Sequence, residues 1–174
     1  MSQREWQIVV LGAKRVVTTS DASMIIEQVA EVHRTPVGDA YVSEELRNWG
    51  DFGGEPSGAW IFPAISFCPD GPFAAALFLE IASQWDVASE VDSMPSYPIL
   101  RESVLTPAAR QTVTSLGAEN PTVGIRIEEE GGWCLIRASG TEPKIRITAE
   151  GTNLQAAKAM LAKGRDLIRQ GKTA

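Results

Sequence analysis

The residues best suited to chemistry lie in one stretch, Arg137 to Arg146, which reads Arg-Ala-Ser-Gly-Thr-Glu-Pro-Lys-Ile-Arg. Ser139 and Thr141 offer hydroxyl donors, and Gly140 lets the backbone bend so that successive amides point at one acceptor. Arg137 and Arg146 add forked, charge-assisted hydrogen bonds. These residue types predict a binding site for an anion. The alternative is a solvated turn with basic strand ends.

A second candidate stretch, residues 53–58, reads Gly-Gly-Glu-Pro-Ser-Gly. Its glycines, including Gly54 and Gly58, allow a ligand to approach the backbone closely. Glu55 is an acceptor and Ser57 a donor, and such a pair two residues apart can bind neighbouring hydroxyls of a sugar. The same residues often form a plain turn, so both interpretations stay open on this evidence.

The elements that position the second stretch follow from periodicity. Between residues 7 and 94, short apolar runs alternate with helical spacing, which is typical of a layered α/β domain. Strands are predicted at residues 8–11, 16–18 and 60–62, and helices at residues 20–32 and 43–49. A longer helix begins after Asp70, and because it is apolar nearly all round it is predicted to be buried against a sheet.

The anion loop belongs to a different domain. Pro95 and Pro98 favour an extended connector, so we place a domain boundary after residue 96, which gives domains 1–96 and 97–174. Beyond it, alternation of apolar and polar residues predicts strands at residues 122–129, 133–136 and 145–149, followed by a helix from Asn153 to Gly171. The Arg137 loop therefore joins two antiparallel strands of a small α+β domain.

Both stretches resemble loops of one enzyme family, the α-D-phosphohexomutases. Arg-x-Ser-Gly-Thr-Glu-Pro followed by Arg is similar to the phosphate-binding loop of their fourth domain, and residues 53–58 resemble the sugar-binding Gly-Glu-x-Ser-Gly loop of their third domain. The resemblance extends to residues 18–30, 34–39 and 69–71. It is nearest to the archaeal phosphoglucosamine mutase branch, with related phosphoglucomutases and phosphomannomutases.

The resemblance implies a fold and a set of ligand contacts. The fold is a three-layer α/β/α domain with a mixed sheet, followed by a small α+β domain whose antiparallel sheet is packed by helices, like the TATA-binding protein. The implied phosphate-binding residues are Arg137, Ser139, Gly140, Thr141 and Arg146. The implied sugar-binding residues are Glu55, Ser57, Gly54, Gly58 and Arg34. Glu142 is assigned to loop structure because its charge would repel a phosphate, and the role of Lys144 stays open.

Two catalytic features of the family are missing from the 174 residues. There is no Ser-His-Asn-Pro sequence for a phosphoserine, and no two aspartates stand two positions apart, as an Asp-x-Asp-x-Asp metal loop requires. We therefore expect no catalytic residue and no cofactor in this chain, with Mg²⁺ expected only in the N-terminal half of the family enzyme. Ala59 and Pro36 replace a histidine and a lysine of many relatives, which leaves sugar specificity and activity open.

Composition excludes several classes of partner. A formal charge of −6 and a pI near 4.9 argue against nucleic acid and anionic membranes, which are bound through broad basic surfaces. The sequence has no apolar run long enough for a membrane span and no signal-peptide pattern, so a cytoplasmic location is expected. Cys68 and Cys134 are predicted to be reduced thiols.

The leading hypothesis is the sugar-phosphate recognition half of a phosphohexomutase, an isomerase that transfers a phosphoryl group between positions 1 and 6 of a hexose or glucosamine phosphate. Alone, the chain is expected to be catalytically incomplete. The expected partners are the sugar phosphate and either an N-terminal-half subunit or a second copy of the chain. The alternatives are a non-catalytic phosphosugar-binding module and a relic that acts as an interaction protein.

Overall fold

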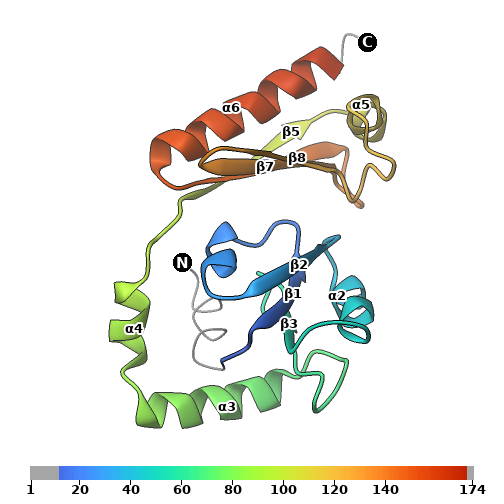
Figure 1. Cartoon of the computed structure of the whole chain (residues 1–174). Helices are drawn as coiled ribbons and strands as arrows, with labels where there is room; N and C mark the ends of the chain where they lie inside the picture. Colours follow the sequence, from blue (N-terminus) through green and yellow to red (C-terminus); the bar gives the residue numbers. More distant parts are fainter. Residues whose placement is uncertain (1–11, 172–174) are drawn as a thin grey trace. The chain divides into compact units, whose positions relative to one another are not determined.

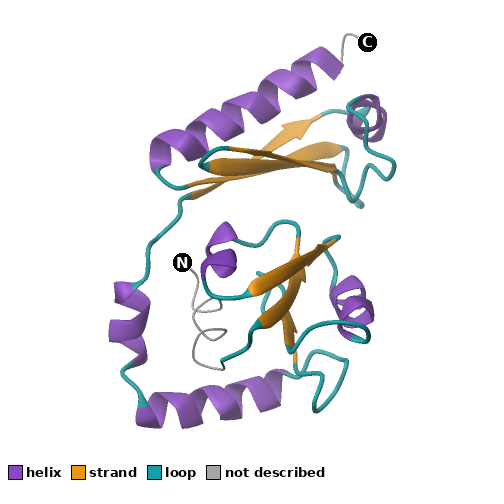
Figure 2. Cartoon of the chain, viewed as in Figure 1, coloured by secondary structure: helices purple, strands orange, loops and turns teal. Residues whose placement is uncertain are grey.

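The computed structural model describes residues 12–171, so the strand expected at residues 8–11 lies outside the described part. The chain divides into two compact units, Met1–Ser96 and Tyr97–Ala174 (Figure 1). Each unit contains one four-stranded sheet with helices packed beside it (Figure 2). The first sheet is mixed and the second is antiparallel, which confirms the predicted fold class.

The sheet of the first unit has the strand order β2-β1-β3-β4. Strand β1 (Arg15–Thr19) lies between its parallel neighbours β2 (Glu31–Thr35) and β3 (Phe52–Gly54), and β4 (Trp60–Ile61) runs antiparallel to β3. The consecutive Val16 and Val17 of β1 are both fully buried, and Val17 packs into the core of the unit. Because β1, β2 and β3 are parallel, their carboxyl ends meet at one edge of the sheet.

The helix expected over residues 20–32 is wrong in extent. A single 3₁₀ turn, η1 (Met24–Gln28), forms after Ser23, whose hydroxyl accepts a hydrogen bond from the Ile25 amide. The residues that follow pair with β1 as strand β2, because a partner distant in sequence outweighs the weak local preference for a helix. Helix α2 (Asp39–Leu46) begins four residues before the predicted 43–49 helix.

Helix α3 (Gly71–Gln84) begins where the sequence predicts, with the Asp70 carboxylate accepting from the Phe73 amide at 2.9 Å. Its predicted burial is wrong, because Ala74 is the one fully buried residue that the helix contains and the side chain of Leu79 is 69% exposed. The described part of the unit covers a single face of α3. Helix α4 (Val87–Ser93), which the sequence did not predict, follows it.

The sheet of the second unit has the strand order β5-β8-β7-β6, with all pairs antiparallel. Its strands are β5 (Ile99–Leu105), β6 (Ile125–Glu129), β7 (Gly132–Ala138) and β8 (Lys144–Gly151). Helices α5 (Ala109–Ser115) and α6 (Leu154–Gly171) complete the unit. The three predicted strands and the closing helix are confirmed, whereas β5 and α5 were not predicted.

Helix α6 lies along one face of this sheet (Figure 1). Gly164 of α6 contacts Ile136 and Ile147, which are fully buried, and this face forms the core of the unit. Since strand side chains alternate, the neighbours of these isoleucines, Arg137 and Arg146, point to the opposite face.

Both cysteines are free thiols, as predicted, with Cys134 buried and Cys68 exposed. Burial raises the pKa of the Cys134 thiol to about 11. Among residues 12–171, none of the helices combines the length and the hydropathy that a membrane span requires.

Candidate functional site

The predicted anion loop is the connection between β7 and β8, residues 139–143. Its ends are held by backbone hydrogen bonds from the Ser139 amide to the Lys144 carbonyl at 2.9 Å and from the Thr106 amide to the Pro143 carbonyl at 2.9 Å. Ser139 is buried, whereas Gly140 and Thr141 are exposed at the tip. The loop is therefore anchored to the sheet on both sides and open to a ligand at its tip.

Arg137 and Arg146 are directly opposite each other in the β7–β8 register. Cross-strand neighbours have Cβ atoms roughly 5 Å apart, and like charges in such a pair destabilise a sheet. Arg137 forms no ion pair with any residue between 12 and 171, and the buried Nε of Arg146 has no hydrogen-bond partner. A pair of arginines left in this state is suited to bind an anion between their side chains.

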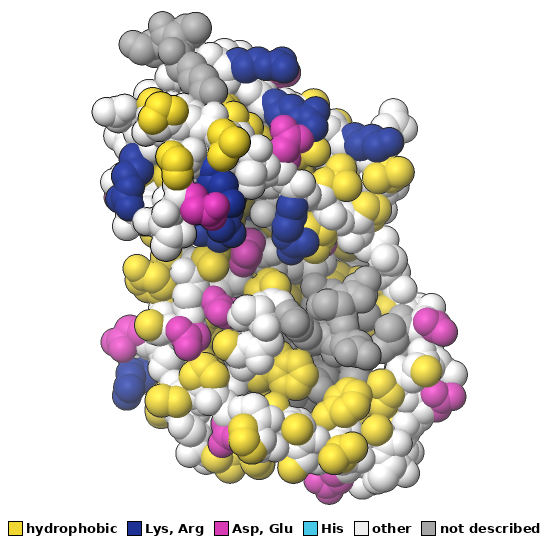
Figure 3. All heavy atoms as spheres, turned by 180° about the vertical axis from the view of Figure 1, so that it is seen from behind, with side chains coloured by type: hydrophobic (Ala, Val, Ile, Leu, Met, Phe, Trp, Pro, Cys, Tyr) yellow, Lys and Arg dark blue, Asp and Glu magenta, His cyan; other side chains and the backbone are white. Residues whose placement is uncertain are grey.

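Glu142 lies among the cations of the loop. Its Oε2 is 2.7 Å from Nζ of Lys144 and 3.4 Å from Nη2 of Arg146. The hydrogen bond from Lys144, followed by the charges of Lys144 and Arg146, lowers the pKa of Glu142. With Arg137 included, three positive charges and one negative charge give the loop a net charge of +2. Seen from behind, other Lys and Arg side chains also gather on this unit (Figure 3).

The predicted sugar loop lies at the carboxyl end of β3, where Glu55 directly follows the strand. The Glu55 amide donates to the Ala59 carbonyl and the Gly58 amide donates to the Glu55 carbonyl, both at 3.0 Å. Gly58 has φ 102°, a left-handed conformation that favours glycine and closes the turn. The Ser57 hydroxyl donates to Oε2 of Glu55 at 2.9 Å, while the buried Oε1 has no partner. The loop thus presents a carboxylate and a hydroxyl already joined.

Gly53 and Gly54 belong to β3, so the expected loop over residues 53–58 is shorter than predicted. The Gly54 carbonyl accepts a hydrogen bond from the Thr18 hydroxyl at 2.8 Å. A Cβ at Gly53 would lie 2.5 Å from Cδ1 of Leu46, because α2 packs tightly on this strand. The glycine at position 53 is therefore explained by helix packing.

Arg34, at the end of β2, uses all five of its guanidinium N–H groups inside the protein. They donate to the carbonyls of Thr19, Ala22 and Ser23 and twice to Oε1 of Glu27, at 2.7–3.1 Å. These bonds hold the segment after β1 against β2. They leave no N–H group of Arg34 for a sugar hydroxyl.

His33 is paired in a way that its sequence neighbours did not indicate. Its Nδ1 is 2.8 Å from Oε1 of Glu45, and its ring stacks on Trp49 with a centroid separation of 3.6 Å. Glu45 and Trp49 come from the α2 segment, twelve or more residues away. The acidic partner of His33 is thus supplied by the tertiary fold and not by residues close to it in sequence.

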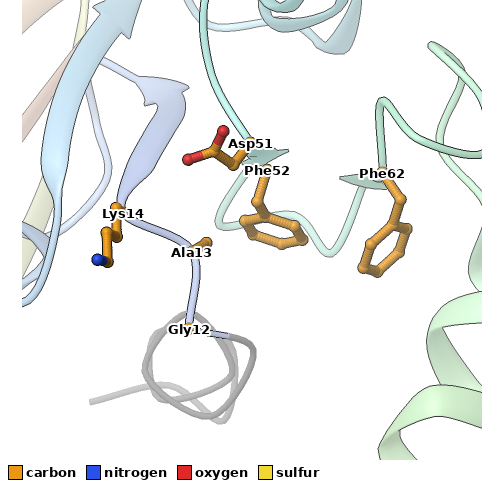
Figure 4. A pocket seen from close by; sticks show the side chains of 6 residues that line it. All are labelled: Gly12, Ala13, Lys14, Asp51, Phe52 and Phe62. Carbon is orange, nitrogen blue, oxygen red and sulfur yellow. The ribbon is translucent and has the colours of Figure 1, made fainter.

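A pocket of about 330 Å³ opens at the other end of the strands, near Lys14, Asp51, Phe52 and Phe62 (Figure 4). The Asp51 carboxylate is bound to Arg15 at 2.7 Å, and this hydrogen bond lowers its pKa. The pocket borders the amino end of β3, whereas Glu55 follows its carboxyl end, so the two features are separate. Within the described residues, no cluster of three or more His, Cys, Asp or Glu side chains is arranged to hold a metal ion.

Two family models match the chain, one for each unit. Residues 4–97 match the model described as phosphoglucomutase/phosphomannomutase, alpha/beta/alpha domain III, and residues 104–167 match the C-terminal domain of the same family. Among solved structures, a phosphoglucomutase/phosphomannomutase family protein from Burkholderia thailandensis has a similar fold. Its TM-score is 0.75 at 21% identity, over 97% of this chain and 40% of that one.

Curated relatives carry the same family name in more specific form. A phosphoglucosamine mutase from Methanocaldococcus jannaschii is 40% identical, over 94% of this chain and 41% of its own length. A probable phosphoglucosamine mutase from Methanocella arvoryzae is 39% identical, over 89% of this chain and 39% of its own length. The chain thus spans about two fifths of the length of these relatives. It belongs to the phosphoglucomutase/phosphomannomutase family and comprises the third and the C-terminal domains of that family.

Proposed function

We propose that this chain is the sugar-phosphate recognition part of a phosphoglucosamine mutase. The observation that carries the proposal is the cross-strand pair of Arg137 and Arg146. Within residues 12–171 Arg137 forms no ion pair, and Arg146 has only the 3.4 Å contact with Glu142 and a buried Nε without a hydrogen-bond partner. Both named curated relatives are described as phosphoglucosamine mutases, and solved relatives include N-acetylglucosamine-phosphate mutases with substrate and product bound.

The charge of the phosphate loop suits a phosphate monoester. Such a group carries a charge of about −1.5 to −2 near neutral pH, which balances the net +2 of the loop. The two guanidinium groups bind its oxygens with forked hydrogen bonds, and the hydroxyls of Ser139 and Thr141 and the amides of Gly140 and Thr141 complete the contacts. Because the arginines project from paired strands, their spacing is set before the ligand arrives, which lowers the entropy lost on binding.

The sugar loop contributes the second set of contacts. The unpartnered Oε1 of Glu55 accepts a hydrogen bond from one sugar hydroxyl, and Ser57 bonds a neighbouring one. We therefore assign recognition of the phosphate to the loop after β7 and recognition of the sugar hydroxyls to the loop after β3. The family reaction also requires a phosphoserine and Mg²⁺. The described residues offer no set of acidic ligands that fits this metal, so we assign recognition and no step of the transfer to this chain.

Calorimetric titration tests the proposal. We expect glucosamine 6-phosphate and glucose 1,6-bisphosphate to bind, and glucosamine without a phosphate to give no measurable heat. Mixing the chain with the phosphoserine- and metal-bearing half of a relative is expected to produce mutase activity. The absence of heat with all phosphorylated sugars at millimolar concentration would contradict the proposal and favour a relic with a different role.

We also propose that the face of α3 that residues 12–171 leave exposed binds a second copy of the chain. Ala75, Ala76, Leu79 and Ala82 share this face, and all four are exposed. A helix that is apolar on all sides is normally buried, and small residues allow close helix packing. In the view from behind, hydrophobic side chains crowd the unit that carries α3 (Figure 3).

Replacing Leu79 by glutamate is therefore expected to reduce self-association. The wild-type chain should show a mass that rises with concentration in sedimentation equilibrium, and Leu79→Glu should remain closer to the monomer. Leu105→Glu is the matched control, because Leu105 is 78% exposed and lies in the other unit. A wild-type chain that is monomeric at every concentration would contradict self-association through α3.

A further inference from the structure

We propose that Glu142 is a specificity-determining residue of the phosphate loop. It neutralises Lys144 and weakly restrains Arg146, so that an incoming phosphate takes Arg146 while Lys144 remains bound to Glu142. The inference rests on the proposed function, because it assumes that the loop binds phosphate. It gives a role in ligand binding to Glu142, which the sequence analysis assigned to loop structure, and to Lys144, whose role the sequence left open.

The two contacts of Glu142 differ in strength. The Lys144 contact, at 2.7 Å, has the length of a charge-assisted hydrogen bond, whereas the Arg146 contact, at 3.4 Å, is longer than a normal N–H···O bond. The Lys144 amide also donates to the Glu142 carbonyl at 2.8 Å, so backbone and side chain tie these two residues together. Arg146 is the cation that a ligand can most easily remove from Glu142.

The exposed fractions agree with this division. The Lys144 side chain is 18% exposed, while the Arg146 side chain is 43% exposed. The buried Nε of Arg146 has no partner, so a phosphate oxygen placed there would gain a hydrogen bond that nothing in the free protein replaces. Lys144, in contrast, already has its carboxylate.

The charge balance explains what Glu142 does to affinity. Without its carboxylate, the loop would carry a net charge of +3 and would attract any polyanion more strongly. Because Glu142 stays on Lys144 beside the bound phosphate, it repels that phosphate. The groups are exposed and screened by solvent, so the repulsion is moderate. Glu142 thus lowers the affinity of the loop for anions in general. It also keeps the net charge of the loop at +2, which matches a phosphate dianion.

The test measures binding of inorganic phosphate and of glucosamine 6-phosphate by calorimetry at low ionic strength. Glu142→Gln keeps the size of the side chain and removes its charge, and we expect affinity to rise on the order of tenfold. Lys144→Met is expected to change affinity little in the wild-type chain, where Lys144 is already neutralised. In the Glu142→Gln chain, where Lys144 has lost its carboxylate partner, Lys144→Met should lower the affinity for phosphate several-fold more than it does in the wild-type chain.

Three outcomes are distinguishable. Tighter binding in Glu142→Gln together with the stronger effect of Lys144→Met in that background supports the inference. Unchanged or weaker phosphate binding in Glu142→Gln overturns the inference about Glu142. If the wild-type chain binds phosphate and Arg146→Ala does not, the proposed function still stands. Absence of phosphate binding in both the wild-type chain and Glu142→Gln overturns both. Thermal unfolding of each variant shows that the second unit is folded.

Discussion

Arg146→Ala is expected to lower the affinity for glucosamine 6-phosphate on the order of a hundredfold. A hydrogen bond to a charged group contributes about 1.5–3 kcal/mol, and the guanidinium of Arg146 offers two of them to a phosphate. About 1.4 kcal/mol corresponds to a tenfold change in affinity, so two bonds at the lower end of this range, about 3 kcal/mol, amount to roughly two decades. Calorimetric titration of the variant beside the wild-type chain measures the effect.

The stability of the ligand-free protein should move in the other direction. Arg146 lies opposite Arg137, and removing one of two like charges relieves a repulsive cross-strand pair. We therefore expect the unfolding temperature of Arg146→Ala to be equal to or above that of the wild-type chain. If Arg146 had only a structural role, its replacement would lower the unfolding temperature. Loss of sugar-phosphate binding without loss of stability therefore indicates a role in binding.

The matched control is Arg101→Ala. Arg101 is exposed on β5, pairs with Thr148 and lies on the same face of the sheet as Arg146, but away from the β7–β8 loop. Arg101→Ala removes the same formal charge, so its effect on ligand affinity measures long-range electrostatics alone. Equal losses of affinity in the two variants would mean that the general positive charge of this face, and not a built phosphate site, accounts for binding.

Gly151→Ala is expected to be the most destabilising single substitution considered. A Cβ at this position would lie 2.2 Å from the Ala157 amide nitrogen and 2.7 Å from the carbonyl carbon of Ala156. Both are backbone atoms in the first turn of α6, which the Asn153 side chain caps through the Ala156 amide at 2.9 Å. Backbone cannot rotate away as a side chain can, so the start of α6 must move off the end of β8.

Overpacking of this kind costs about 3 kcal/mol. For a unit of this size, each kcal/mol shifts the unfolding temperature by about 4–8 °C, so a decrease on the order of 10–20 °C is expected. Thermal unfolding followed by circular dichroism measures it. Gly140→Ala is the control, since a Cβ there meets nothing within 4 Å. Matching unfolding curves for the two variants would show that the first turn of α6 does not pack against Gly151 closely enough to exclude a Cβ.

The second unit was predictable because its signals are local. Alternating apolar residues such as Ile125 and Ile127 indicate strands, and the glycines after Glu130 indicate the turn between β6 and β7. The elements that were missed depend on distant partners. Strand β2 forms by pairing with β1, and β5 by pairing with β8, although neither stretch has a clean period of its own. Propensity over a few residues does not contain those pairings.

The site residues show the same contrast between what neighbouring residues indicate and what distant contacts decide. Residue types and spacing marked Arg137, Ser139, Arg146, Glu55 and Ser57 as candidates, because hydroxyls, a carboxylate and guanidinium groups define their own chemistry, and the family resemblance favoured a ligand site over a plain turn. The partners of these groups were not accessible in this way. Arg34 was selected for a ligand, yet its five donors are used within the chain, by carbonyls and a carboxylate that the turn after β1 brings around it.

By itself, the sequence determined the two loops, the strands on either side of the phosphate loop and the family to which they point. Tertiary structure decided which charges face each other: Arg137 opposite Arg146, Glu142 on Lys144, and Glu45 on His33. It also decided that residues 12–171 cover a single face of α3. The physical reason is that strand register and side-chain pairing arise from contacts between distant segments, whereas donor chemistry and period-two patterning reside in consecutive residues.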